Sequence, residues 1–533
     1  MGRAISKWRI GAAASLALVL AATAAGAQKN GGILRMYASD SPASMSIHEE
    51  ATVFAQGPMM GVFNNLVVFD QHAKQSKLDT IVPDLATEWS WDEGGTRLTF
   101  KLRQGVKWHD GAPFTAKDVV CTYDLLLEKS ADKLRVNPRK QALKNLDSVT
   151  TESDYQVSFH LKRPQPAFMM LLATGFSPIY PCHVPAAQMR QRPIGTGPFK
   201  FVEFKPNEAI RVARNPDYWK PGRPYLDGVE YTVIRNPGTA VLAFVSGKVD
   251  MTFPNQLTVP LFRDVKNQVP QAICEQTPDG GVNRHLLINR DMAPFNNLDL
   301  RRALALAIDR KAFVDIISEG QGEIGGVLQP LPGGVWGLPP ERLATLPGYD
   351  PDVGKSREEA RQIMRRLGYG PDNRLRVKVT TRDIPQYRDP AVLLIDQLKQ
   401  VYVDGELEAV DTPNYFPKIR RKDFAVALNL QTSGPDPDPT LDLFYGCGSS
   451  LNWDGYCNSE IDRLIEQQSS EGDTGRRQAL LWEIERRLAQ EATRPIIFYT
   501  KGATCWQPYV KNVNLMLNSI FNANRREDWW LDK

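Results

Sequence analysis

Between Thr99 and Asp124 the sequence places Trp108, His109 and Asp110 side by side, and a His next to an Asp could serve general acid-base chemistry. From Thr96 to Arg103, apolar and polar residues alternate, which is the pattern of a half-buried strand. Neighbours on a strand point to opposite faces, so an adjacent His and Asp are badly placed to act together. We therefore expect this segment to be structural.

Two further patterns resemble functional motifs without meeting their requirements. The run from Gly348 to Ser356 has five residues between its glycines, where a phosphate-binding P-loop needs about four. We expect Ser356 to cap a helix there, with Glu359 at the third helical position and Gly368 just past the end. The six His residues are scattered singly without metal-binding spacing. We therefore expect neither a metal site nor a cofactor.

The elements that must position any site are both strands and helices. Alternating patterns predict strands at 33–37, 66–70, 96–103, 156–161 and 228–234, and Thr115 with Asp118 predicts a capped helix after the third of them. Apolar residues at helical spacing predict helices from Leu300 and over 459–468 and 475–490. The chain is therefore predicted to be mixed α/β, with roughly three domains for 533 residues.

The first 27 residues have the composition of a secretory signal peptide. Three basic residues precede a small-apolar run from Ile10 to Ala22, and Ala25-Gly-Ala27 fits a cleavage site. No Cys lies near this site, so we expect a periplasmic protein without a lipid anchor. The net charge of +4 gives no reason to expect nucleic acid as a partner.

Six cysteines follow the predicted cleavage site, and an oxidising compartment favours disulfides. Cys447 and Cys457 flank a short loop rich in Gly, Ser and Asn, so we expect these two to pair. The sequence leaves open how the other four pair, namely Cys121, Cys182, Cys274 and Cys505.

Several segments in order along the chain carry a family resemblance. The chain resembles the family 5 extracellular solute-binding proteins, which are the dipeptide- and oligopeptide-binding components of ATP-binding-cassette (ABC) importers. The segments are LRQGVKWHDGAPFTAKDV from Leu102, IGTGPFKF from Ile194, RNPDYWKPGRPYLDGVE from Arg214, VSGKVDM from Val245 and, approximately, LDLRRALALAIDR from Leu298.

This resemblance implies a two-lobed periplasmic-binding-protein-like fold of class II, enlarged with an extra domain in lobe I. Lobe I would span 28–285 and 500–533, with the extra domain at about 66–193, and lobe II would span 286–499. Two crossing strands, near His285 to Arg290 and Arg494 to Thr500, would form the hinge.

The resemblance also implies a function. The protein would capture a peptide or another small polar solute between its lobes, as a monomer, and deliver it to a membrane permease. In peptide-binding relatives an Asp before an Asp-Pro pair meets the peptide ammonium. Asp436 matches that position only if the loop shifts by one residue, and otherwise it is an ordinary turn residue. The expected ligand contacts are Tyr37 and Ser39 from lobe I, and Thr432, Ser433, Asp436 and Trp453 from lobe II.

One alternative function belongs to a different class. A secreted hydrolase could use paired carboxylates, for which Asp436 and Asp454 are candidates. That reading needs the two carboxylates to face each other across a cleft.

Overall fold

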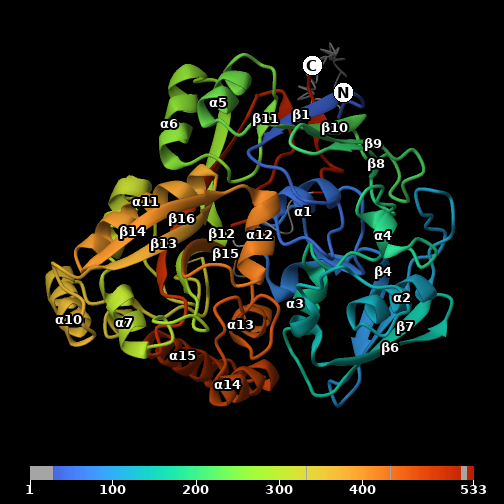
Figure 1. The fold of residues 1–533 in the computed structure, drawn as a ribbon. Helices are drawn as coiled ribbons and strands as arrows, with labels where there is room; N and C mark the ends of the chain where they lie inside the picture. Colours follow the sequence, from blue (N-terminus) through green and yellow to red (C-terminus); the bar gives the residue numbers. More distant parts are fainter. Residues whose placement is uncertain (1–27, 332, 433, 518–524) are drawn as a thin grey trace, which may run out of the picture.

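The computed structural model describes residues 28–331, 333–432, 434–517 and 525–533 (Figure 1). Within these residues, ten strands form one large sheet in the order β14-β13-β15-β12-β16-β11-β1-β10-β9-β8. The strands are β1 (Ile33–Ala38), β8 (Phe199–Lys205), β9 (Ala209–Arg214), β10 (Gly228–Val233), β11 (Met251–Thr252), β12 (Ile273–Ile288), β13 (Leu375–Arg382), β14 (Val403–Val410), β15 (Val426–Thr432) and β16 (Ile496–Trp506).

The long antiparallel strands β12 and β16 connect the two ends of this sheet. Their pairing shifts between Pro278 and Asn283, so that the first half of β12 lies beside β16 alone and the second half also pairs with β15. The structure therefore has two lobes that share one sheet. Here lobe I means the elements from β1 to α6 with the C-terminal strands, and lobe II means those from α7 to α15.

Lobe I is built around β1, which lies between β10 and β11 and is parallel to both. The first described residues pack beside the C-terminus on this part, since Lys29 forms an ion pair with Asp532 at 2.8 Å, and the C-terminus lies near β1 (Figure 1). Its other elements are α1 (Val53–Met59), β2 (Val67–Phe69), η1 (Leu78–Thr80), β3 (Ile81–Pro83), α4 (Ala186–Met189), α5 (Pro237–Val245), α6 (Val259–Gln268), β17 (Val510–Lys511) and β18 (Trp530–Leu531).

A second, four-stranded sheet in lobe I has its own hydrophobic core, and the Trp-His-Asp segment lies in the connection between its strand β5 and helix α2. Its order is β4-β5-β7-β6. The predicted capping box is confirmed, because Thr115 and Asp118 exchange side-chain to backbone hydrogen bonds. The elements are β4 (Ala86–Trp91), β5 (Arg97–Leu102), α2 (Ala116–Leu126), η2 (Lys140–Leu143), β6 (Leu146–Ser153), β7 (Gln156–Leu161) and α3 (Phe168–Ala173).

The same segment has structural roles, as the sequence predicted. Trp108 is buried and its Nε1 donates to Asp118 at 3.3 Å. His109 bonds the backbone through both ring nitrogens, with Gly195 N donating to Nδ1 at 3.2 Å, and burial lowers its pKa to about 4. Asp110 pairs instead with His183 at 2.7 Å. No proton-transfer pair forms between the adjacent His and Asp.

In lobe II, helices pack on the sheet end formed by β13, β14 and β15. The predicted cap at Ser356 is wrong, because the helix begins four residues earlier with Asp352 as its cap, accepting from Lys355 N at 2.9 Å. Gly368 follows the helix at a φ of +87°, as its type predicts. The helices are α7 (Leu298–Leu306), α8 (Arg310–Ile317), α9 (Pro340–Leu343), α10 (Val353–Arg366), α11 (Pro385–Lys399), α12 (Thr412–Arg420), α13 (Pro437–Tyr445), α14 (Ser459–Ser470) and α15 (Thr474–Gln490).

All six cysteines form disulfides. The predicted pair of Cys447 and Cys457 is confirmed and closes the loop between α13 and α14. Cys274 and Cys505 join the long strands β12 and β16 within lobe I, at a Cα–Cα distance of 4.1 Å. The third disulfide ties α2 to the segment before α4, through Cys121 and Cys182.

None of the helices in the described residues combines the length and the apolar character that a membrane span requires.

Candidate functional site

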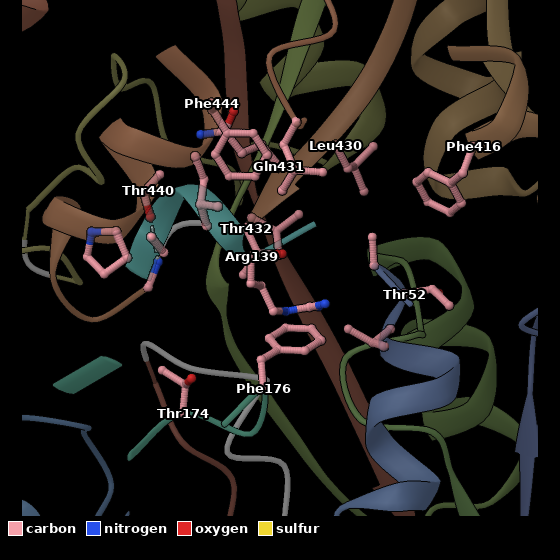
Figure 2. Close-up of a pocket in the computed structure, with 18 of the residues that line it drawn as sticks. Thr52, Arg139, Thr174, Phe176, Phe416, Leu430, Gln431, Thr432, Thr440 and Phe444 are labelled. Atoms are coloured by element: carbon pink, nitrogen blue, oxygen red, sulfur yellow. Dashed lines mark hydrogen bonds between the residues drawn. The ribbon is translucent and has the colours of Figure 1, made fainter. Parts of the chain in front are cut away.

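A cavity of about 230 Å³ lies between the two lobes. Lobe I contributes the start of α1, the segment around η2 and the loop after α3, while lobe II contributes the end of β15, α12 and α13 (Figure 2). Thr52, Arg139 and Phe176 line the cavity from one side, and Phe416 and Thr432 from the other. A ligand in this cavity would touch both lobes.

The cavity wall is mainly apolar with a few polar groups, which is typical of sites for small organic ligands. Aliphatic side chains such as Leu126, Met170 and Leu430 line it from both lobes. Its aromatic members are Phe54, Tyr123, Phe176, Tyr387, Phe416, Phe444 and Trp453.

Arg139 of lobe I is one of three arginines among the described residues that line this cavity. Its guanidinium donates to the backbone carbonyls of Ile47 at 3.2 Å and Glu50 at 2.7 Å, and its Cζ lies 3.7 Å from the centre of the Phe176 ring. Burial lowers its pKa to about 9, and the nearby Tyr180 and Glu50 counteract this shift. The side chain is only partly accessible, and it borders the cavity.

A second cavity arginine, Arg382, links the lobes. It stands at the end of β13 and donates to Asp40, which follows β1, at 2.9 Å. Both side chains are buried. Beside this ion pair, Gln386 of lobe II donates to the backbone oxygen of Gln256 of lobe I at 2.9 Å. These contacts hold the two lobes against each other along one edge of the cavity.

Asp436, the predicted ligand contact, lines the cavity but is engaged by the protein. Arg477 of α15 donates to its two carboxylate oxygens at 2.9 and 2.5 Å. The same carboxylate accepts from Asp438 N at 2.9 Å and so caps α13. Asp436 and Arg477 are both buried. The carboxylate is therefore neutralised without a ligand.

Of the other predicted ligand contacts, some line the cavity and others do not. Thr432 lines the cavity, and so does Trp453, whose Nε1 donates to Ser450 O at 2.8 Å. Tyr37 is buried in a neighbouring core, and Ser39 donates to the Gln256 side chain at 2.9 Å, and neither is among the described residues that line the cavity. Ser433 lies outside the described residues.

The geometry does not support the hydrolase alternative. Asp454 is buried, pairs with Arg494 at 3.0 Å and is not among the residues that line the cavity. Among the described residues that line the cavity, Asp436 therefore faces no partner carboxylate. In the part of the chain that the structure describes, no group of three or more His, Cys, Asp or Glu side chains could hold a metal ion.

Sequence reasoning missed Arg139, Phe176, Phe416 and Phe444. Arg139 and Phe176 come from loops without periodic pattern, and Phe416 looks like an ordinary apolar residue of a helix. Only the packing of the two lobes brings these side chains to one cavity, so no local signal could have identified them.

Comparisons with known proteins agree with this architecture. The family model described as bacterial extracellular solute-binding proteins, family 5 Middle, matches residues 80–452. Di/tripeptide-binding protein 1 of Pseudomonas aeruginosa is 24% identical over 495 residues, which cover 87% of each chain. Heme-binding protein A of Haemophilus influenzae is 28% identical over 436 residues, which cover 76% of each chain.

A solved structure shows the same fold. The periplasmic binding protein DppA of Helicobacter pylori, in complex with the peptide STSA, superposes with a TM-score of 0.83 at 22% identity, covering 95% of this chain and 99% of that one. The expected two-lobed periplasmic-binding-protein fold is therefore confirmed. Since the family model matches well over half of the sequence, this chain belongs to the family 5 bacterial extracellular solute-binding proteins.

Proposed function

We propose that this protein is the solute-capturing component of an ABC importer and that it binds a peptide or another small solute between its lobes. One observation carries this proposal: the cavity is lined by both lobes and bordered by contacts between them, such as the ion pair of Arg382 with Asp40. The relatives support it, since their names describe binding proteins for di- and tripeptides and for heme.

The mechanism follows from the shape of the site. A ligand that touches both lobes binds the closed form better than the open form, and so shifts the equilibrium towards closure. A shift from 1:99 to 99:1 needs about 5.5 kcal/mol of preference for the closed form. We place the hinge where the chain crosses between the lobes, near His285 to Arg290 and Arg494 to Thr500, beside the register shift between Arg284 and His285. Lobe I would then be 28–285 and 500–533, with its extra domain at about 66–193, and lobe II would be 286–499.

The proposed ligand contacts include those expected from sequence. Thr432, Ser433, Asp436 and Trp453 would act in lobe II, and Tyr37 and Ser39 in lobe I. The support is strongest for Thr432 and Trp453, because both line the cavity and carry no ion pair. A direct bond from Asp436 to a ligand cation stays a prediction. The pairing of Asp436 with Arg477 argues against it.

The cellular setting belongs to the same proposal. The signal sequence at 1–27 would direct the chain to the periplasm and be cleaved there, leaving a monomer without a lipid anchor. The closed protein would then dock on a membrane permease and release its ligand.

The test is to purify the protein from the periplasm of its host, denature it and identify the released small molecules by mass spectrometry. The proposal expects one chemical class at close to one molecule per chain, and a mature chain that starts at Gln28. A released compound should bind again to refolded protein. A protein that carries no small molecule and binds none from a host extract would contradict the proposed function.

A further inference from the structure

We propose that the cavity selects ligands that carry an anionic group, such as a carboxylate, on an apolar body, and that Arg139 beside Phe176 is the anchor for the anion. This inference rests on the proposed function and names the ligand class for the same cavity. It also implies that a free ammonium group contributes little to recognition.

The positive charge of Arg139 is not neutralised by an ion pair. Its guanidinium donates to backbone carbonyls, and no described carboxylate forms an ion pair with it. The other charged groups at the cavity are engaged by the protein: Arg382 pairs with Asp40, Asp436 pairs with Arg477, and Arg284 donates to the Thr500 hydroxyl. The carbonyls orient the guanidinium but do not neutralise its positive charge, so Arg139 can still pair with an anionic group of a ligand.

Arg139 lies between the lobe I loops, with the Phe176 ring against its guanidinium, in the middle of the cavity residues drawn in Figure 2. Three backbone carbonyls and one ring fix its orientation before any ligand arrives, which reduces the entropy lost on binding. A partly buried charge that has the nearby Glu50 but no ion pair to offset it is costly, and a ligand carboxylate would relieve that cost through charge-assisted hydrogen bonds.

The rest of the cavity wall has one acidic side chain among its described residues. This side chain is Asp436, and Arg477 donates to both of its carboxylate oxygens. No described carboxylate at the wall is therefore available to pair with a ligand ammonium. Opposite Arg139, Leu430, Phe416 and Phe444 offer an apolar surface for the body of the ligand.

The test uses three probes that differ only in their end groups: Leu-Phe, N-acetyl-Leu-Phe and Leu-Phe amide. Each is titrated calorimetrically into protein freed of ligand by unfolding and refolding. We expect N-acetyl-Leu-Phe to bind at least as tightly as Leu-Phe, and the amide to bind at least about tenfold more weakly, because only the amide lacks the anion.

A matched pair of variants assigns the effect to Arg139. Arg139→Gln should weaken N-acetyl-Leu-Phe by about tenfold or more and change the amide by less than about twofold. Arg192→Gln removes the same charge from an exposed position and should change neither affinity. Arg139→Lys keeps the charge and should recover part of the binding, which guards against a variant that merely loosens the loops.

Four outcomes would overturn the inference. The amide could bind as tightly as the N-acetyl peptide, or N-acetylation could abolish binding; either result leaves the proposed function standing and removes the anion preference. If none of the probes binds, the molecule released from natively purified protein decides the matter: a cationic or neutral ligand overturns the inference alone, whereas the absence of any ligand overturns the proposed function as well.

Discussion

At the scale of single residues, the Asp436 carboxylate has a structural role. It caps α13 and forms a two-pronged, buried ion pair with Arg477 of α15. Removing one partner of a buried ion pair leaves the other charge unpaired in a poorly solvated place. Variants of Asp436 should therefore lower the free energy of unfolding before they affect ligand affinity.

We predict that Asp436→Asn lowers the free energy of unfolding by about 3 to 5 kcal/mol, because Arg477 then stays buried without a carboxylate. Asparagine can still cap a helix, so the measured loss of unfolding free energy reports the ion pair and not the cap. Asp473→Asn is the matched control, since Asp473 caps α15 from an exposed position. Denaturant unfolding monitored by circular dichroism measures both variants.

The control variant should lose less than about 0.5 kcal/mol. Equal stability of Asp436→Asn and wild type, together with a large loss of ligand affinity, would contradict this account and support a direct contact between Asp436 and a ligand cation.

At the scale of elements, α13 connects lobe II to the extra sheet of lobe I. Asp442 of α13 forms an ion pair with Lys144, just after η2, at 2.5 Å. One turn earlier, Asp438 accepts from Gln165 of lobe I at 2.7 Å and from Gln468 of α14. This helix therefore has its acidic face buried between the lobes.

Burial is the main cause that raises the pKa of Asp442 to about 7, with Lys144 acting in the opposite direction. The unfolded carboxyl titrates near 3.8, so the folded protein binds an extra proton between about pH 4 and pH 7. The free energy of unfolding should consequently fall as the pH rises through this window. The charged groups that face Asp442 directly or through its partner are Lys144, Arg163, Asp438 and Glu466.

The measurement is urea unfolding of wild type and Asp442→Asn at pH 5 and pH 8. Other titrating groups cancel in the difference between the two proteins. We predict that wild type loses on the order of 2 to 4 kcal/mol more than the variant between these pH values. Parallel pH profiles for the two proteins would refute the assignment to Asp442.

The disulfides give a second prediction at this scale. The Cys274–Cys505 bond closes a loop of 231 residues and the Cys447–Cys457 bond one of 10. In the loop-entropy model these closures are worth about 5 and about 3 kcal/mol. The Ser double variant of the first pair should therefore unfold at lower denaturant concentration than that of the second pair, and the reverse order would rule out this model as the explanation.

Local sequence patterns predicted those elements well whose signals all lie within a few neighbouring residues. The strand at 156–161 and the helix after Thr115 follow from alternation and from a capping box, both read within a few residues. The start of α10 was predicted at Ser356 because two acceptable caps, Asp352 and Ser356, stand close together. The cavity could not be predicted, because Arg139 and Phe416 come from different lobes and meet only through tertiary packing.

At the scale of the whole molecule, two lobes share one sheet through β12 and β16, and the cavity lies where the lobes face each other. The buried ion pair of Arg382 with Asp40, the hydrogen bond from Gln386 to Gln256 and the contacts of α13 with lobe I all cross between them. These polar contacts would break in an open form. A ligand that bridges the lobes would favour the arrangement in which they are made.

The central claim, that ligand capture closes the two lobes, is tested most directly by small-angle X-ray scattering. Protein freed of ligand by unfolding and refolding is measured before and after saturation with the small molecule released from natively purified protein. The account predicts a smaller radius of gyration for the complex, with a scattering profile that fits the closed structure described above. An unchanged radius and profile at full saturation, verified by calorimetry, would contradict it.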